Sequence, residues 1–529
     1  RDCLLSRGLG DVYKRQDEKL IDKAVSRVLL AKFRMGLFED PYGEKYEAQS
    51  LHSRENIRVA RQIADESTVL LKNDKGLLPL NLSELNSIAV IGPNANQVQF
   101  GDYTWSRTNK DGVTPLEGIR KLTEPFGIQI RYAQGCSMMS LDTIHIASAV
   151  EAARQSDVAI LFCGSSSASL ARDYNETNCG EGFDLADLAL TGAQGKLIKA
   201  IHATGKPVIL VLVTGKPFSI AWEKKHIPAI LIQWYAGEQE GSSIANILFG
   251  KTNPSGHLTV SFPQSSGHLP AYYNYLPTDR GFYHKPGSYE QPGRDYVFSS
   301  PGPLWAFGHG LTYTTFNYTD MQIQQSVDSI KVFVTVKNTG RWAGKAVPQL
   351  YVRDVFSSIS TPVKQLKAFN KVALEPGETT RVPLHFAVQD LALTDEAGKT
   401  MVEPGSFEIM IGDASDHILL KQTISIGQNM AVSPCSIKEQ LPEEIGKGNI
   451  IHIKGVVRDV QATPVDKVEI YSTAQQQVIG VTDQNGKYFI DAPEDDVLVF
   501  CKSGYLDEKV NVDRKNDIQI TIRNKMVFP

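Results

Sequence analysis

The sequence predicts a multidomain chain in which an α/β part is followed by all-β parts. Three observations lead to this fold class. Residues 53–263 contain four short apolar runs separated by helical patterns, residues 311–427 contain short alternating segments split by turns, and residues 449–522 repeat that alternation. A chain of 529 residues is also too long for one hydrophobic core, so three or four domains are expected.

The α/β part, residues 46–265, is expected to be an αβα sandwich with a mostly parallel sheet. Its strand candidates are apolar throughout, which is typical of parallel strands covered on both faces. Helical patterns lie between and before them, and Ser53 is placed to cap the first of these. The four strand candidates are SIAVIGPNA, DVAILFCGS, KPVILVLVTGKP and PAILIQWYAG, and three helical stretches are SRENIRVARQIADEST, IHIASAVEAARQS and LTGAQGKLIKAIHATG.

The start of the chain is expected to differ in origin from the rest. Residues 1–16, RDCLLSRGLGDVYKRQ, have no clear period and resemble translated adapter sequence at the end of a gene fragment. Residues 17–45 predict an amphipathic helix that Gly36 ends, followed by a linker. One helix cannot bury its own apolar face, so we expect its partners in a missing part of a truncated protein. The residues on that face are Ile21, Val25, Val28, Leu29 and Phe33.

The second half of the chain is predicted to be all-β. Residues 266–310 are rich in Gly, Pro and Tyr and predict an ordered connection. Residues 311–427 have the alternation and turns of an immunoglobulin-like or fibronectin type III-like β-sandwich. A linker at 428–447 precedes a second small β-sandwich at 448–529, in which DQNG predicts a hairpin.

Composition and charge exclude several functional classes. The net charge is −4 without a long basic block, so nucleic acid and anionic membrane are not expected as partners. The six cysteines are scattered and predict neither a metal site nor a dense disulfide framework. No apolar run approaches the roughly 18 to 20 residues of a membrane span. No phosphate-binding glycine motif accompanies Gly92 and Pro93, which argues against a nucleotide-binding protein.

The stretch CGEGFDLADLALTGAQ places Glu181 between two glycines, after the carboxyl end of a predicted strand. A carboxylate in such a loop can be presented to a ligand, and ligands of parallel sheets bind at that edge. The alternative is that Glu181 is a surface acid in a mobile loop and binds no ligand. Glu176 and Asp184 are the neighbouring carboxylates that could take this role instead. We expect Glu176 to be solvated, and Asp184 fits an N-cap of a following helix equally well.

A second candidate binding segment is GDYTW at 101–105. Asp102 and Trp105 suit sugar binding, because aromatic faces stack on pyranose rings and carboxylates accept hydrogen bonds from hydroxyls. A packed loop without a ligand is the alternative. Glu238 and Glu240 precede a helical stretch, where carboxylates favour the helix dipole, and we interpret them as structural.

Several stretches together resemble glycoside hydrolase family 3. They span about residues 17 to 427: LLKNDKGLLPL, IAVIGPNA, GKPVILVLVTGKPFSIAW, WYAGEQEGSSIANILFGKTNPSGHLTVSFP, PLWAFGHGLTYTTFNY and VKNTGRWAGKAVPQLYV. The resemblance implies a domain order of (β/α)8 barrel, αβα sandwich and fibronectin type III-like domain. Of the barrel, this chain would keep only the last helix. The stretches KGVVRD, TDQNGKYFID and SGY resemble a carboxypeptidase regulatory-like domain.

The resemblance implies retaining, exo-acting hydrolysis of terminal β-glucosyl or β-xylosyl residues by two carboxyl groups about 5 to 5.5 Å apart. Glu181 matches the family's acid/base, and the nucleophile would lie on the missing barrel, so the fragment would be inactive alone. Gly182 and Asp184 also match, whereas Leu185 stands where arginine is common. We therefore add Asp184 to Asp102 and Trp105 as substrate-binding candidates.

This chemistry requires no metal or organic cofactor, and its partner is a glycoside or oligosaccharide. The intact protein would be periplasmic or secreted. A non-catalytic alternative remains open, in which the β-sandwiches are carbohydrate-binding or cell-surface interaction modules.

Overall fold

The computed structural model describes residues 18–42, 52–104, 106, 109–167, 176–277, 288, 290–292, 296–427, 430–431, 450–475, 477–502, 508–512 and 515–522. The chain divides into two compact units, residues 1–432 and 433–529. The predictions for residues 1–16, for Trp105 and for most of the linker at 428–447 lie outside the described residues.

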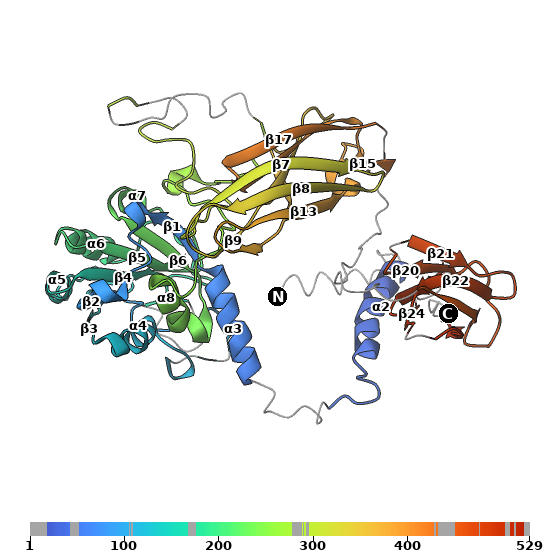
Figure 1. Ribbon diagram of the computed structural model, residues 1–529, viewed down its shortest axis with the longest axis horizontal. Coiled ribbons are helices and arrows are strands. Elements are labelled where there is room, and N and C mark those ends of the chain that lie inside the picture. Colours follow the sequence, from blue (N-terminus) through green and yellow to red (C-terminus); the bar gives the residue numbers. More distant parts are fainter. Residues whose placement is uncertain are drawn as a thin grey trace. The chain divides into compact units, whose positions relative to one another are not determined.

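A six-stranded sheet forms the centre of the α/β part, in the order β1-β6-β5-β4-β2-β3 (Figure 1). Strand β1 runs antiparallel to β6, and the other neighbours are parallel. The predicted, mostly parallel sheet is therefore confirmed. Its strands are β1 (Val69–Asn73), β2 (Ser87–Ile91), β3 (Gln129–Ala133), β4 (Val158–Gly164), β5 (Val208–Val213) and β6 (Ala229–Gln233).

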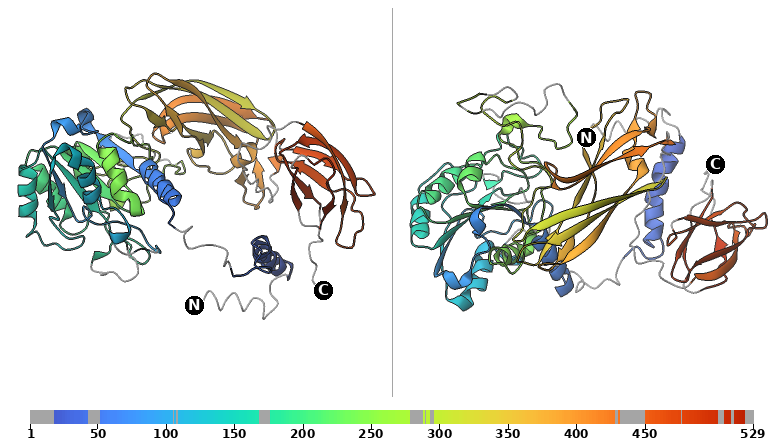
Figure 2. Two further views of the ribbon diagram at one scale, coloured as in Figure 1. Left: turned by 60° about the horizontal axis from the view of Figure 1, so that its bottom comes forward. Right: turned by 45° about the horizontal axis from the view of Figure 1, so that its top comes forward.

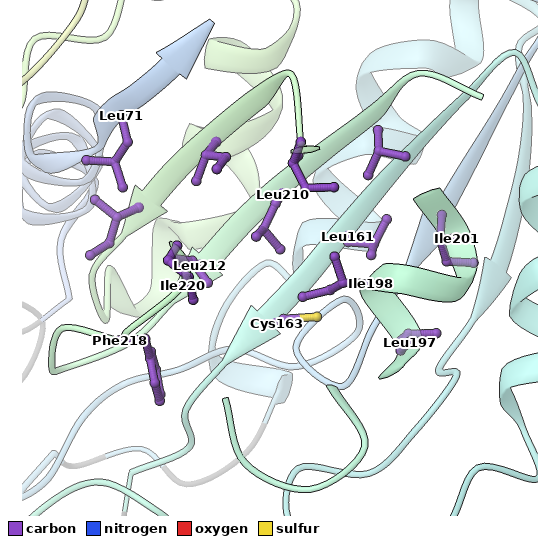
Figure 3. Packing of buried hydrophobic residues seen from close by; sticks show 14 of the residues in the cluster. Leu71, Leu161, Cys163, Leu197, Ile198, Ile201, Leu210, Leu212, Phe218 and Ile220 are labelled. Carbon is purple, nitrogen blue, oxygen red and sulfur yellow. The ribbon is translucent and has the colours of Figure 1, made fainter. Parts of the chain in front are cut away.

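Helices cover both faces of this sheet. One core contains residues of α5 and α6, and the other contains residues of α4 and α8. Figure 3 shows side chains of α6, β4 and β5 packed together in the first core. The helices are α3 (Arg54–Ser67), α4 (Pro115–Thr123), α5 (Ile146–Arg154), α6 (Gln194–His202), α7 (Ala221–His226) and α8 (Glu240–Leu248).

The strands match the apolar runs because β2, β4, β5 and β6 are buried along their whole length. The Ser53 side chain accepts a hydrogen bond from the Asn56 backbone N–H at 3.2 Å, which confirms the predicted cap of α3. The sequence analysis did not assign β1 and β3. Strand β3 is an edge strand with exposed or half-buried side chains, so it lacks the apolar run that marks the central strands.

The predicted N-terminal helix is α2 (Glu18–Arg34). Gly36 follows it with a φ of 66°, and the Leu37 N–H donates to the Lys32 carbonyl at 3.1 Å, as expected for a glycine that ends a helix. Part of its apolar face is exposed, including Val25, Val28 and Phe33. None of the helices within the described residues combines the length and apolar character that a membrane span requires.

The residues after the α/β part form a β-sandwich of two main sheets, with orders β13-β8-β7 and β11-β10-β16-β17. Their inward side chains share one core. Figure 2 shows these strands in yellow to orange. The strands are β7 (Phe316–Gln325), β8 (Ser329–Asn338), β9 (Gly344–Ala346), β10 (Gln349–Asp354), β11 (Gln365–Phe369), β12 (Val372–Leu374), β13 (Thr379–Ala387), β14 (Leu393–Thr394), β15 (Thr400–Val402), β16 (Gly405–Ala414), β17 (His417–Ile426) and β18 (Met430–Ala431).

The second unit is a smaller β-sandwich with sheets β22-β19-β25 and β21-β20-β23-β24 around its own core. The DQNG segment forms a tight turn, in which Asp483 Oδ1 accepts from the Lys487 N–H at 2.8 Å. The predicted hairpin is wrong, because the strands on either side of the turn belong to different sheets. The strands are β19 (Ile450–Arg458), β20 (Glu469–Ser472), β21 (Gln477–Val481), β22 (Lys487–Pro493), β23 (Val497–Cys501), β24 (Glu508–Asn511) and β25 (Ile520–Thr521).

Single-turn 3₁₀ helices complete the described structure: η2 (Asp74–Gly76), η3 (Leu82–Glu84), η4 (Asn109–Asp111), η5 (Glu124–Phe126), η7 (Gly237–Gln239), η8 (Ser266–His268) and η9 (Val388–Leu391).

The segment between the α/β part and the first β-sandwich is hydrogen-bonded to strand β1. Its Trp305 indole N–H donates to the Leu71 carbonyl at 3.0 Å. His309 Nε2 lies 3.0 Å from the same carbonyl. These contacts join the connecting segment to strand β1.

Candidate active site

The carboxyl edge of the parallel sheet carries the loop that contains Glu181. After β4 the chain passes through Ser165, Ser166 and Ser167, and it returns to the same place at Asn178. The Asn178 side-chain oxygen accepts from the Ser166 N–H at 2.8 Å, and the Asn178 N–H donates to the Ser166 carbonyl at 3.2 Å. Both ends of the loop base are thus tied together at the sheet edge.

Glu181 lies in an exposed turn that follows Asn178. Gly180 and Gly182 flank it with φ values of 118° and 81°, which residues with a side chain rarely adopt. The Phe183 N–H donates to the Gly180 carbonyl at 3.1 Å and closes the turn. The Glu181 carboxylate has no hydrogen bond or ion pair with any described residue. The backbone is therefore held while the carboxylate is available to a ligand.

Asp102 lies against this turn, although it is 79 residues away in the chain. Its Oδ2 accepts a hydrogen bond from the Glu181 backbone N–H at 3.0 Å. Its Oδ1 is buried and has no hydrogen-bond partner among the described residues. The structure therefore brings Asp102 and Glu181 together. Tyr103, the next residue, is 75% exposed and has a φ of 57°.

Two other predicted residues lie differently from what the sequence suggested. Asp184 is exposed, and no helix begins there, because α6 starts only at Gln194. The alternative in which Asp184 caps a helix is therefore wrong. Glu176 is not solvated: it is half-buried, and its Oε2 accepts from the Met138 N–H at 2.7 Å. Burial, with the charge of Glu176 as a smaller cause, raises the pKa of the Cys136 thiol to about 12.

Lys216 is a site residue that the sequence analysis missed. Its Nζ donates to the Phe183 carbonyl at 2.9 Å, so a third loop, which follows β5, also holds the turn. The neighbouring Gly215 has no side chain, and a Cβ there would lie 2.9 Å from Cys179 Sγ. The Thr-Gly-Lys sequence at the carboxyl end of an apolar run was the available signal.

A buried polar cluster lies beneath the loop. The Tyr235 and Ser165 hydroxyl oxygens are 2.6 Å apart, and the Ser165 hydroxyl donates to Thr214 Oγ1 at 3.0 Å. Burial raises the pKa of Tyr235 well above its ordinary value, so the phenol remains a neutral donor. The Tyr235 ring also lies near Gly101, where an added Cβ would be 3.6 Å from the ring. Tyr235 thus supports both the Asp102 segment and the Glu181 loop base.

Glu240 and Glu238 have structural roles, as predicted. Glu240 is fully buried, and its Oε2 accepts from the Gln99 backbone N–H at 2.7 Å. Burial raises the pKa of Glu240 well above its ordinary value, which favours the neutral acid. Glu238 Oε2 pairs with His52 Nε2 at 2.5 Å. At this edge, Glu181 is therefore the exposed glutamate whose carboxylate is not engaged by a described residue.

Comparison with known proteins identifies two domains. Residues 68–313 match the glycosyl hydrolase family 3 C-terminal domain, and residues 346–415 match a fibronectin type III-like domain. A β-xylosidase of Formosa agariphila is 38% identical over 424 residues, which are 77% of this chain and 55% of that protein. A periplasmic β-glucosidase of Salmonella typhimurium is 36% identical over 431 residues, which are 75% of this chain and 54% of that protein.

Among solved structures, β-glucosidases also resemble this chain. A β-glucosidase of Erythrobacter marinus matches with a TM-score of 0.68 and 36% identity, over 80% of this chain and 57% of that one. A β-glucosidase of Listeria innocua bound to isofagomine matches with a TM-score of 0.67 and 32% identity, over 80% and 57% of the two chains. The chain spans about half the length of the curated relatives it matches. It therefore contains a glycosyl hydrolase family 3 C-terminal domain and a fibronectin type III-like domain, and its relatives are β-glucosidases and β-xylosidases.

Proposed function

We propose that this chain supplies the acid/base carboxyl group of a retaining, exo-acting β-glycosidase, and that Glu181 is that group. One observation carries the proposal. Glu181 is exposed between two glycines of positive φ at the carboxyl edge of the sheet, and its backbone, but not its carboxylate, is engaged by described residues. Glu176 and Glu240 bind backbone N–H groups and are less available.

The proposed reaction has two displacement steps. In the first, the Glu181 carboxyl donates its proton to the glycosidic oxygen while a nucleophilic carboxylate attacks the anomeric carbon and the aglycone leaves. In the second, the Glu181 carboxylate takes a proton from a water molecule that attacks the same carbon, and the sugar leaves with its configuration retained. Glu181 thus acts as acid and then as base.

The nucleophile is proposed to come from a part of the enzyme that this chain does not span. Asp102 contacts the loop backbone, but one of its oxygens accepts from the Glu181 N–H and the other is buried. The relatives are about twice as long as the matched region. The exposed apolar side chains of α2 also fit a helix whose partner is a further domain, the (β/α)8 barrel that precedes the α/β part in this family. We expect the chain alone to be inactive.

The proposed substrates are terminal β-glucosyl or β-xylosyl residues, because the relatives carry both names. Of the three sugar-binding candidates from the sequence, Asp102, Trp105 and Asp184, we keep Trp105 and Asp184 as proposed contacts to the sugar, because one Asp102 oxygen accepts from the Glu181 N–H and the other is buried. One relative is named periplasmic, and we propose a periplasmic or secreted location for the intact protein. We also propose that residues 448–529 are a carboxypeptidase regulatory-like domain, supported by a separate core and by seven short strands among the residues of this range that the structure describes.

The test uses the gene product extended upstream, with aryl β-glucosides and aryl β-xylosides whose leaving groups range from activated to poor. For Glu181→Gln, kcat/KM on poor leaving groups should fall by about 10²- to 10⁴-fold, because general acid catalysis contributes that much. Activated aryl glycosides need little protonation, and their first step should change far less.

The control is Glu124→Gln, an exposed glutamate after α4 and outside the site. It should behave like the parent on every substrate. An unchanged Glu181→Gln enzyme, or one that loses activity equally on all leaving groups, would contradict the acid/base assignment.

A further inference from the structure

A residue from another loop, Asp102, holds the backbone of the proposed acid/base, Glu181. Asp102 Oδ2 accepts from the Glu181 backbone N–H at 3.0 Å. Asp102 follows β2 and Glu181 follows β4, so the contact joins two loops at the carboxyl edge of the sheet. The distance of 3.0 Å is that of an ordinary N–H···O hydrogen bond. The contact therefore restricts the residue that carries the acid/base carboxyl.

Gly180 makes this close approach possible. A Cβ at Gly180 would lie 2.2 Å from Asp102 Oδ2 and 2.8 Å from Oδ1, which no real side chain could occupy. The carboxylate therefore stands where the side chain of any other residue would be. A Cβ at Gly182 has nothing within 4 Å, so that glycine serves the backbone conformation alone. The two glycines therefore have different roles, and only the missing side chain of Gly180 leaves room for the Asp102 carboxylate.

The Asp102 segment also lies near a half-buried tyrosine, Tyr235. A Cβ added at Gly101 would lie 3.6 Å from the Tyr235 ring, and Gly101 has a φ of 84°. Tyr235 is tied through Ser165 to the end of β4, which is the strand that leads into the Glu181 loop. Asp102 and the loop base therefore rest on one support. Burial of Oδ1 leaves the carboxylate little freedom to turn away.

We propose that Asp102 is a positioning residue for the acid/base, which fixes the Glu181 backbone so that the carboxyl group meets the glycosidic oxygen. This inference rests on the proposed function of Glu181. It differs from the expectation that Asp102 binds a sugar hydroxyl, because Asp102 acts here through Glu181. Misplacing a catalytic group by about 1 Å can cost about 10²-fold in rate, so such a contact is large enough to matter.

The first test needs no activity and uses the 529-residue chain. Amide hydrogen exchange at Glu181 should be about tenfold faster or more in Asp102→Ala, because the N–H loses its acceptor. Asp102→Asn keeps an acceptor oxygen and should retain most of the protection. Asp142→Ala is the matched control: this exposed aspartate accepts from the Ile144 N–H at 2.9 Å in another loop. Unchanged exchange at Glu181 in Asp102→Ala would overturn the proposal.

The second test measures catalysis in the gene product extended upstream. In Asp102→Ala, kcat/KM on poor leaving groups should fall by about 10- to 100-fold, with a much smaller loss on activated leaving groups. Asp102→Asn should recover most of that loss, and Asp142→Ala should match the parent. A rise in KM that is equal for all leaving groups would show a sugar-binding role instead and would overturn positioning.

The two tests separate this inference from the function on which it rests. If Glu181→Gln is fully active, the proposed function fails and the catalytic part of the inference fails with it. The exchange experiment still decides whether Asp102 holds the loop. If Glu181→Gln shows the acid/base signature and Asp102→Ala does not, only the positioning role is overturned.

Discussion

Two glutamates beside glycines lie at the same edge of one sheet and have opposite environments. Glu181, in CGEGFD, is exposed, whereas Glu240, in GEQEGS, is completely buried. Both follow the carboxyl end of an apolar strand, and their local sequences look alike. The difference lies in what the neighbouring glycines do in the fold.

The glycine after Glu240 serves close packing of two helices. A Cβ at Gly241 would lie 1.9 Å from the Thr114 carbonyl oxygen, and a Cβ at Gly118 would lie 2.0 Å from the Gly241 carbonyl oxygen. Helices α8 and α4 therefore meet backbone to backbone, and Glu240 at the start of α8 is enclosed. The glycines beside Glu181 instead have positive φ, and no helix follows directly. Glu181 is thus exposed in an irregular turn, whereas Glu240 is buried at the start of a helix.

The largest expected effect on stability comes from filling the helix contact. Gly241→Ala should destabilise the α/β domain by about 3 kcal/mol, because α4 and α8 must separate to admit the methyl group. Gly195→Ala in α6, where a Cβ meets nothing within 4 Å, should be neutral or stabilise by up to about 1 kcal/mol. Urea unfolding followed by tryptophan fluorescence measures both. Equal midpoints for the two variants would contradict the packing explanation.

We expect a smaller difference between the two glutamates in how substitution changes folding stability with pH. Burial raises the pKa of Glu240 in the folded state, so Glu240 stabilises the fold below the unfolded pKa of 4.5 and this contribution is lost as the pH rises through the folded pKa. Glutamine mimics the neutral acid without titrating. Glu240→Gln should therefore gain stability relative to the parent as the pH rises above 4.5.

The matched comparison is Glu181→Gln, measured by urea unfolding over the same pH range. Its side chain is exposed and bonds to no described residue, so stability should change by less than about 0.5 kcal/mol at every pH. If Glu240→Gln were destabilising above pH 4.5, the buried carboxyl would have to be ionised and paired, and the contrast between the two glutamates would be wrong.

Much of the fold could be predicted from local pattern. The four central strands are apolar throughout because both of their faces are buried, so their composition reveals them. Edge strand β3 has half-exposed side chains and gives no such signal. The sequence predicted the DQNG turn correctly. It did not show that the strands on either side join different sheets, because strand pairing is set by tertiary packing.

The candidate site was predictable only in part. Glu181 between glycines was visible in the sequence, as was Asp102 beside aromatic residues. The hydrogen bond between them joins residues 79 apart and depends on how β2 and β4 bring their loops together. Lys216 was missed for the same reason, since its partner is a backbone carbonyl of another loop. Local sequence indicates which groups can act, and topology decides which of them meet.

The central claim, that Glu181 is the acid/base, is tested most directly by the product that azide gives with Glu181→Ala in the upstream-extended enzyme. An activated aryl glycoside still forms the glycosyl-enzyme, and azide, which needs no base, attacks it from the side that water would use. The account predicts restored turnover and a glycosyl azide of β configuration. A glycosyl azide of α configuration would make Glu181 the nucleophile, and full activity without azide would leave it no catalytic role; either result would contradict the claim.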